Sequence, residues 1–263
     1  MSLLASYALN GIDVDDNDYD WVLLAVSSPL PGIANRVQSL IVGGQDGNIP
    51  VPMSEDSPVI TLVIRVPFET NETFLALCDA AALTLTHDSY SAAVELLTVS
   101  AADLGMDYVD YAVVLRFSGM AWRDPSVSTS AAAAISTTPI AVSILSGISA
   151  PVRDAIVRVA GSVTGLRVTD TQGSYFEYLA NIPSGSYLRF EAATGRAFVT
   201  TTNTWVGGTE VTSSIDYGPG PYFLSLTPKF TTPETRAAGL TVTTTARASS
   251  PTIEVRAAGA YRV

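Results

Sequence analysis

The stretch Val59-Ile60-Thr61-Leu62-Val63-Ile64-Arg65-Val66 is the clearest β-strand signal in this chain of 263 residues. It is rich in Val, Ile and Thr, which favour pleated, half-buried structure. Similar runs lie on either side of it, Trp21–Val26 before it and Tyr111–Phe117 after it. These runs predict that the first half of the chain is built mainly from strands.

A hairpin and one helix are expected around the central strand. Residues 43–48 are a strong turn signal, so Val37–Met53 is expected to form a hairpin whose prolines place its second arm at a sheet edge. Thr70 is expected to cap a helix, with Glu69 and Glu72 near its positive N-terminal end. The expected apolar face of this helix comprises Phe74, Leu77, Cys78 and Ala81.

The second half of the sequence consists of short strand candidates between Gly, Pro and Ser turns. Their spacing of roughly ten to fifteen residues is typical of an antiparallel sandwich or barrel. No long helix is expected after residue 85. The expected strands are Ile140–Leu145, Ala155–Ala160, Gly165–Thr169, Tyr175–Leu179, Tyr187–Glu191, Arg196–Thr200, Tyr222–Leu226, Leu240–Thr245 and Thr252–Ala257.

A step in charge divides the chain. Residues 1–125 contain 17 acidic and 4 basic residues, a net charge of −13, whereas residues 126–263 contain 8 acidic and 10 basic residues, a net charge of +2. We therefore predict a first domain over 1–125, a small-residue connector over 126–137 and a second domain over 138–263. The run Ala131–Ala134 in the connector is also compatible with the beginning of a strand.

The overall charge of −11 argues against several functions. A nucleic-acid-binding protein needs basic patches, which the sequence lacks, and an anionic membrane surface is disfavoured for the same reason. The N-terminus lacks the features of a signal peptide, and no apolar run is long enough for a membrane helix. The single cysteine excludes an internal disulfide framework, so we expect a protein that is made and folded in the cytosol.

Side chains suited to catalysis are scarce. The only histidine, His87, lies in a polar stretch with Asp88 and Ser89, and is interpreted either as a general base or as an exposed loop residue. Cys78 is either a small buried hydrophobe or a reactive thiol. One Cys and one His cannot form a zinc site, and phosphate-binding glycine motifs are absent. We therefore predict no catalytic, cofactor-binding or metal-binding residue, no cofactor and no enzymatic activity.

Acidic and aromatic residues leave three further interpretations. One concerns the acidic run Asp13, Asp15, Asp16, Asp18 and Asp20. This run lacks the Gly and Glu of a calcium-binding loop, so it is either a solvated loop or an irregular calcium site. A glycosidase pair of carboxylates would come from Asp154, Asp170, Glu177, Glu191 and Glu210. The aromatic residues that would either stack on sugar rings or pack in a core are Trp205, Tyr175, Tyr178, Tyr187, Tyr217 and Tyr222.

The order of these features resembles the distal tail proteins of long-tailed siphophages, the family often called Dit. The segments that carry the resemblance are Leu9–Ile12, Phe117–Asp124, Thr138–Val142, Asn181–Phe190, Arg196–Val199 and Tyr222–Pro228. The resemblance extends over nearly the whole chain and rests on patterns of strands and turns. The long Gly- and Thr-rich segment Thr201–Gly220 departs from the usual pattern of the family.

The resemblance implies a mostly β fold, with a β-barrel-like N-terminal domain that carries one helix and an extended hairpin, followed by a C-terminal galectin-like β-sandwich. It also implies a virion protein, made in the cytoplasm of a host bacterium. Six copies would form a ring that joins the tail tube to the tail-tip hub, with receptor-binding proteins or host glycans as further partners. Double-stranded DNA would pass through without specific binding.

Two expectations accompany this interpretation. The −13 charge of residues 1–125 predicts a strongly negative ring, which DNA would pass without adsorbing. The alternative function is a carbohydrate-binding or receptor-binding tail protein that acts through the C-terminal sandwich. Exposed aromatic residues gathered on one face would favour that alternative, whereas exposed strand edges would favour the ring.

Overall fold

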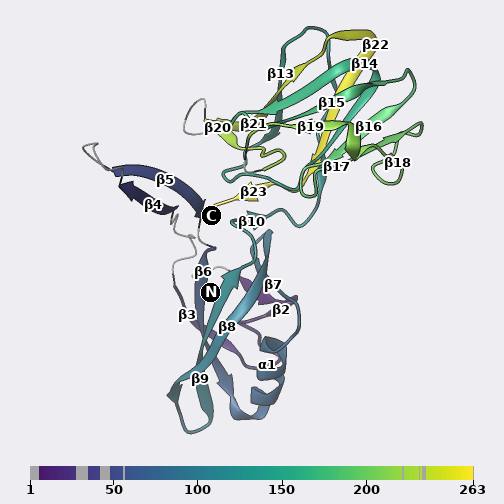
Figure 1. Cartoon of the computed structure of the whole chain (residues 1–263). Helices are drawn as coiled ribbons and strands as arrows, with labels where there is room; N and C mark the ends of the chain where they lie inside the picture. Colours follow the sequence, from purple (N-terminus) through teal and green to yellow (C-terminus); the bar gives the residue numbers. More distant parts are fainter. Residues whose placement is uncertain are drawn as a thin grey trace. The chain divides into compact units, whose positions relative to one another are not determined.

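The computed structural model divides the chain into two compact units, Met1–Pro125 with Arg262–Val263 and Ser126–Tyr261, which we call the N-terminal and the C-terminal unit (Figure 1). The first predicted domain has the same C-terminal bound as the N-terminal unit, whereas the predicted connector falls inside the C-terminal unit. The residues that the structure describes are 6–27, 35–41, 48–55, 57–220, 222–230, 232 and 235–262.

One antiparallel sheet forms the N-terminal unit, with the strand order β2-β1-β7-β8-β9-β6-β3. The predicted strands at 21–26, 59–66 and 111–117 are confirmed, and the last begins three residues earlier than expected. The strands are β1 (Tyr7–Leu9), β2 (Ile12–Asp13), β3 (Val22–Val26), β6 (Val59–Pro67), β7 (Leu83–His87), β8 (Tyr90–Leu104), β9 (Tyr108–Phe117) and β10 (Trp122–Arg123), the last of which pairs with β8.

Alternating side chains of β6 build the core of this unit, because successive residues of a strand point to opposite faces. Ile60, Leu62, Ile64 and Val66 are at most 2% exposed. The core is closed by the predicted helix, α1 (Asn71–Cys78), which follows a 3₁₀ turn, η1 (Phe68–Thr70).

The helix is shorter than its sequence pattern suggests. Phe74 and Cys78 are buried, but Leu77 is only half-buried, and Ala81 lies beyond the helix and is exposed. The expected capping by the Thr70 side chain is wrong, since its hydroxyl bonds to no backbone N–H of the helix. This hydroxyl instead accepts a hydrogen bond from Trp21 Nε1 at 3.0 Å and donates one to the Tyr19 carbonyl at 3.2 Å. Thr70 therefore ties the start of the helix to the segment before β3.

The predicted hairpin is present as a separate two-stranded antiparallel sheet of β4 (Asn35–Ile41) and β5 (Asn48–Glu55). Its register pairs Ile41 with Asn48 and Val37 with Pro52. Most of the predicted turn at residues 43–48 lies outside the described residues.

The C-terminal unit is organised around the long strand β14, which pairs with β15, β16, β21 and β22. Two strands were expected at 155–160 and 165–169, but β14 continues through both, with register shifts at Gly161 and Gly165. The strands are β11 (Ser128–Thr129), β12 (Ala133–Ala134), β13 (Ile140–Ser146), β14 (Ile156–Asp170), β15 (Tyr175–Ile182), β16 (Tyr187–Glu191), β17 (Arg196–Thr200), β18 (Thr209–Glu210), β19 (Ile215–Tyr217), β20 (Pro228–Phe230), β21 (Arg236–Thr243), β22 (Ala246–Ala257) and β23 (Ala260–Tyr261).

Two sequence-based expectations for this unit need correction. The connector at 126–137 contains β11 and β12, which both pair with β22, so it belongs to the sheet. The strand expected at Tyr222–Leu226 is absent, apart from a single bridge between Leu226 and Val152. Stacked rings of Phe176 and Phe190, with centroids 3.9 Å apart, lie in the core of the unit. A mostly β fold is confirmed, and the galectin-like form of the sandwich stays a prediction.

Candidate functional site

His87 is the last residue of β7, so its interpretation as an exposed loop residue is wrong. The strand forms because Leu83-Thr84-Leu85-Thr86 alternates apolar and polar residues, which buries Leu83 and Leu85. The imidazole is half-buried between the rings of Tyr7 and Trp122, whose centroids lie 4.5 and 5.5 Å from its own. Its Nδ1, the Tyr7 hydroxyl and Trp122 Nε1 have no hydrogen-bond partner among the described residues. His87 thus packs as a half-buried ring among aromatic side chains, with the Asp88 carboxylate 3.8 Å from its Nε2.

Cys78 is a buried residue of the helix, 2% exposed. Burial raises the pKa of its thiol to about 11, so the thiol stays protonated at neutral pH. The thiolate is the nucleophilic form of cysteine. Of the two interpretations, the buried hydrophobe is therefore the one that the environment supports.

The acidic run before β3 is shaped by hydrogen bonds to its own backbone. Asp16 Oδ1 accepts the backbone N–H of Asp18 at 2.6 Å, and Asp15 Oδ1 accepts that of Leu23 at 3.4 Å. Among the described residues, three or more His, Cys, Asp or Glu side chains nowhere gather as a metal site would require.

The carboxylates proposed for glycoside hydrolysis are engaged separately. Glu177 pairs with Arg167 at 2.5 Å, Glu191 with Arg189 at 3.4 Å and Glu210 with Arg196 at 2.6 Å. The hydrogen bond from Arg196 is the main reason why the pKa of Glu210 falls to about 2. Asp154 lies in the loop before β14.

Asp170 holds two loops together. Its Oδ1 accepts the backbone N–H groups of Gln172 and Ser174 at 2.8 and 3.0 Å, and its Oδ2 accepts that of Ser225 at 2.8 Å. The carboxylate is buried, and these bonds satisfy both of its oxygens. Asp170 therefore has a structural role.

The six candidate sugar-stacking aromatic residues do not form one platform. The rings of Trp205 and Tyr187 both contact the Arg158 guanidinium, at 4.1 and 5.6 Å. The remaining four are separate: Tyr175 lies over Arg167, Tyr222 over Arg153, Tyr217 packs against Phe223, and Tyr178 is buried.

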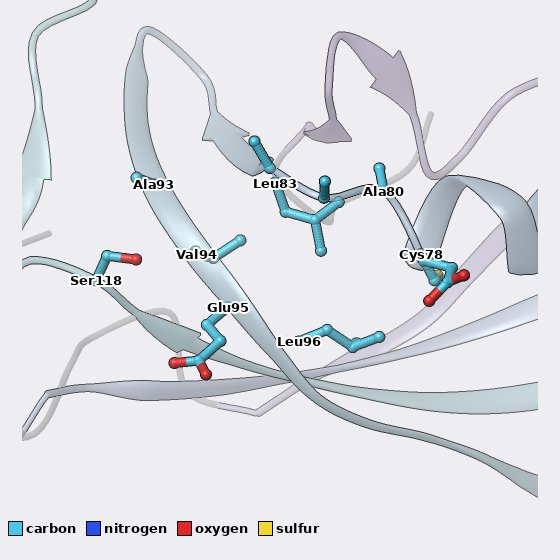
Figure 2. A pocket seen from close by; sticks show the side chains of 11 residues that line it. Cys78, Ala80, Leu83, Ala93, Val94, Glu95, Leu96 and Ser118 are labelled. Carbon is cyan, nitrogen blue, oxygen red and sulfur yellow. The ribbon is translucent and has the colours of Figure 1, made fainter.

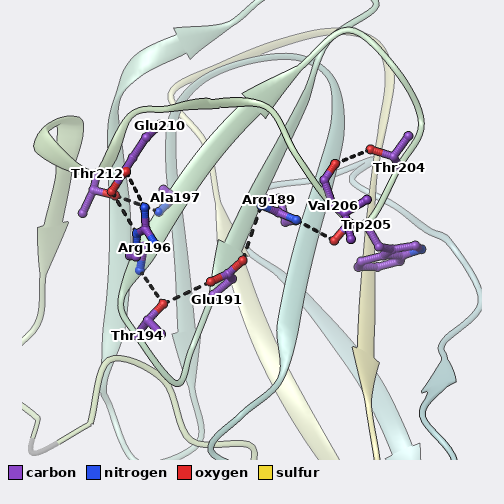
Figure 3. A network of polar contacts seen from close by, with 10 residues as sticks. All are labelled: Arg189, Glu191, Thr194, Arg196, Ala197, Thr204, Trp205, Val206, Glu210 and Thr212. Atoms are coloured by element: carbon purple, nitrogen blue, oxygen red, sulfur yellow. Dashed lines mark hydrogen bonds and ion pairs between the residues drawn. The ribbon is translucent and has the colours of Figure 1, made fainter.

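A polar network covers one face of β14, β16 and β17. Arg158 and Arg189 are direct cross-strand neighbours, each only 5% exposed, and Arg158 is paired with Glu254. The Arg189 guanidinium donates a hydrogen bond to the Trp205 carbonyl at 2.6 Å. Figure 3 shows how the contacts continue from Trp205 through Arg189, Glu191, Thr194, Arg196 and Glu210 to Thr212. The network fixes the loop between β17 and β18 on this face.

The N-terminal unit has a different candidate feature, a long arm formed by β8 and β9. Strand β7 pairs with β8 only as far as Val94, whereas β8 continues to Leu104. Within the described residues, Glu95–Leu104 pairs with β9 alone, so the other edge of this segment is open. At the other end of the path β8-β9-β6-β3, β3 pairs with β6 and with no further strand that the structure describes, and Val22 and Leu24 on it are exposed.

A groove of about 580 Å³ lies where β7 begins and where the open edge of β8 begins (Figure 2). Its walls are the segment Cys78–Leu83, which leaves the helix, and Ala93–Leu96 of β8. Asp79 and Glu95 contribute carboxylates to its lining.

The strand register also shows which residues of β6, β8 and β9 lie on the face opposite the core, which we call the outer face of the arm. It carries neutral residues together with five charged ones, and its two arginines are paired, Arg65 with Asp110 at 2.8 Å and Arg116 with Glu95 at 2.6 Å. Its residues on β6, β8 and β9 are Val59, Thr61, Val63, Arg65, Pro67, Glu95, Thr98, Ser100, Asp103, Tyr108, Asp110, Ala112, Val114 and Arg116.

None of the helices in the described part of the chain combines the length and apolar character needed to span a bilayer.

Comparison with known proteins finds similarity in structure. No protein-family model and no curated protein matches the sequence. The crystal structure of SPP1 Dit (gp 19.1), described as a paradigm of the hub adsorption apparatus in phages that infect Gram-positive bacteria, matches with a TM-score of 0.59 and 12% identity, over 97% of this chain and 99% of that one. Two structures of the phage p2 baseplate, with Ca and with Sr, match at 10% identity with TM-scores of 0.39 and 0.37. These lower scores are too small to establish a common fold. The match to SPP1 Dit confirms the resemblance to the Dit family at the level of the fold.

Proposed function

We propose that this chain is a non-enzymatic structural protein of a long-tailed phage virion. It forms a ring of six copies at the distal end of the tail, joins the tail tube to the tail-tip hub and leaves a channel for DNA. The observation that carries this proposal is the likeness of fold to SPP1 Dit over 97% of the chain. That likeness concerns the fold, so support for the assembly comes from the open strand edges of β8 and β3.

The open edges of the arm suit assembly of identical copies. An unpaired strand edge presents free N–H and C=O groups that pair readily with another strand. Glu95–Leu104 of β8 and Val22–Val26 of β3 lie at opposite ends of the path β8-β9-β6-β3. The β8 edge of one copy can therefore pair with the β3 edge of the next. Such a heterologous contact repeats from copy to copy and closes a ring when the rotation between copies allows it.

The hairpin β4–β5 offers a second contact. It pairs with no other strand among the described residues, so it gains nothing from the main sheet of its own unit. Two-stranded hairpins are marginally stable alone. We assign it the role of an extension that packs on a neighbouring copy.

The outer face of the arm is the candidate wall of the channel. Its three acidic residues, Glu95, Asp103 and Asp110, face two basic ones, Arg65 and Arg116, which gives a net charge of −1. Both arginines are paired with carboxylates, so the described part of this face has no free cation to hold a DNA phosphate. The proposed wall is thus weakly negative, whereas the sequence predicts a strongly negative one.

The ring is tested by the size of the purified full-length chain, measured by light scattering and negative-stain microscopy at increasing concentration. The unmodified chain is expected to form closed rings. Thr98→Lys places a charge at the open edge of β8, and Leu24→Lys does so at β3; each is expected to abolish rings, because edge lysines block strand addition. Thr73→Lys, on the exposed side of α1, is the matched control and should leave rings intact.

Mixing the two edge variants separates head-to-tail pairing from other contacts. The Thr98→Lys variant keeps its β3 edge and the Leu24→Lys variant keeps its β8 edge, so together they should form a heterodimer and nothing larger. Rings that persist in either variant would overturn the edge-pairing arrangement. A chain that stays monomeric at millimolar concentration would contradict the ring itself.

A further inference from the structure

The C-terminal unit contains a groove of about 510 Å³ at one end of its sheets. One wall is the end of β15 and the turn after it, with Tyr178, Asn181 and Pro183. The other wall is formed where β17 ends and β18 begins, with Thr200, Thr201 and Thr209. The size lies in the range of small-ligand sites, which occupy about 300–1,000 Å³.

The lining chemistry defines the class of ligand. The groove is lined by hydroxyl and amide groups together with apolar surface, and none of the described residues that line it is Asp, Glu, Lys, Arg or His. Burial raises the pKa of the Tyr178 phenol, so that group is also uncharged at neutral pH. A charged ligand entering this groove would lose hydration without meeting an opposite charge. A neutral ligand rich in hydroxyl groups can exchange its hydrogen bonds to water for bonds to the wall.

We propose that this groove binds a neutral saccharide, with one pyranose unit lying between Pro183 and the wall formed by Thr200, Thr201 and Thr209. Its hydroxyl groups exchange hydrogen bonds with Asn181, Thr201 and Thr209, and its apolar face packs on the exposed Pro183 ring. The Thr164 hydroxyl donates a hydrogen bond to Asn181 Oδ1 at 3.0 Å. This bond orients the amide and leaves its N–H groups to donate to the ligand.

The threonine wall is fixed before any ligand arrives. The Trp205 ring, in the loop between Thr201 and Gly208, stacks on the Arg158 guanidinium at 4.1 Å, and the Trp205 carbonyl accepts the hydrogen bond from Arg189 at 2.6 Å (Figure 3). Gly208 has φ +103° and passes so close to the backbone that a Cβ atom would lie 2.9 Å from the Val199 carbonyl oxygen. A wall that is held in place spares the ligand the entropy of ordering it. Trp205 is therefore a positioning residue for the groove.

This binding activity goes beyond the ring-building role and does not depend on it. The Thr98→Lys variant, altered in the N-terminal unit, should bind the same sugars as the unmodified chain. A failure of ring assembly and a failure of sugar binding are thus measured separately.

The probe is an array of neutral and anionic oligosaccharides, incubated with the full-length chain, followed by calorimetric titration with the methyl glycoside of the best neutral sugar. Thr201→Val and Asn181→Ala each remove polar groups of the groove and are expected to weaken binding about tenfold, the effect of losing about 1.4 kcal/mol. Trp205→Ala frees the wall and should weaken binding to a similar extent.

Two controls show whether the effect belongs to this groove. Thr241→Val makes the same chemical change at an exposed position of β21 outside the groove. Tyr175→Ala removes a different aromatic ring, which lies over Arg167 at 4.3 Å. Both controls should keep the affinity of the unmodified chain. No retention of neutral sugars, a preference for anionic ones, or affinity unchanged by Thr201→Val and Asn181→Ala would each overturn the proposal.

Discussion

Arg65 and Asp110 form a two-pronged ion pair across β6 and β9, in which Arg65 Nε and Nη2 donate to the two carboxylate oxygens of Asp110 at 2.8 and 2.9 Å. The two residues are direct partners in the strand register. The Arg65 guanidinium also lies 3.8 Å above the Tyr108 ring. The pair lies on the outer face of the arm, so the same two residues stabilise the arm and form part of the proposed channel wall.

The stability of the N-terminal unit is expected to depend on Asp110 at acid pH. The hydrogen bond from Arg65 is the main reason why the pKa of Asp110 lies below its ordinary value of 3.8. A lowered pKa in the folded state gives stability that is present above the ordinary value and is lost as the pH falls through the folded one. Urea unfolding between pH 5 and 2 should show this loss. Asp110→Asn should be less stable at neutral pH and should show a shallower decline, and an unchanged decline would contradict the assignment.

Tyr7 provides a prediction at alkaline pH. Burial is the main reason why the pKa of its phenol rises to about 12, and its hydroxyl has no partner among the described residues. The raised pKa means that the stabilising contribution is complete below pH 10 and is lost as the pH rises toward 12. Tyr7→Phe removes the unpaired hydroxyl, so it should stabilise the unit by about 1 kcal/mol at neutral pH. It should also flatten the alkaline decline, as measured by chemical denaturation. A destabilised Tyr7→Phe variant would show that the hydroxyl is bonded after all.

Asp170→Asn should destabilise the C-terminal unit. The carboxylate accepts three backbone N–H groups, and an amide at this position has only one acceptor atom, so its NH₂ group would face at least one of these donors. A loss of about 2–3 kcal/mol in the free energy of unfolding is expected. Asp216→Asn, at an exposed position of β19, is the control and should change stability by less than about 0.5 kcal/mol. Equal effects of the two substitutions would argue against a structural role for Asp170.

The sequence predicts those elements whose side chains carry the signal themselves. Strand β6 is such a case, because its apolar residues face the core at every second position. Strand β8 has no comparable signal, since most side chains of Glu95–Leu104 are exposed and the segment is held as a strand by β9. His87 was misplaced although Leu83–Thr86 alternates, because the polar residues that follow it suggest a loop.

The same limit applies to the candidate sites. The role of Asp170 depends on Ser225, which is 55 residues away in sequence and meets it only in the folded unit. Of the residues named here for the groove, the sequence singles out only the aromatic Tyr178 and Trp205, because Asn, Pro and Thr side chains carry no distinctive signal until two chain segments bring them together. The acidic character of the first half is evident from composition, but its distribution between loops and the outer face depends on strand register.

Gly161 tests why one strand runs where two were expected. At this residue β14 shifts register against β22 between Ala160 and Ser162, and the backbone has φ +100°. A Cβ atom here would lie 2.9 Å from Pro251 Cα, so Gly161→Ala combines a strained conformation with a backbone clash. We expect a loss of about 2–4 kcal/mol in unfolding free energy. Gly173→Ala shares a positive φ of +89° but meets nothing within 4 Å, so it should lose only about 1 kcal/mol. Similar losses in both variants would show that the close approach of Pro251 adds nothing and that strain in φ alone requires glycine.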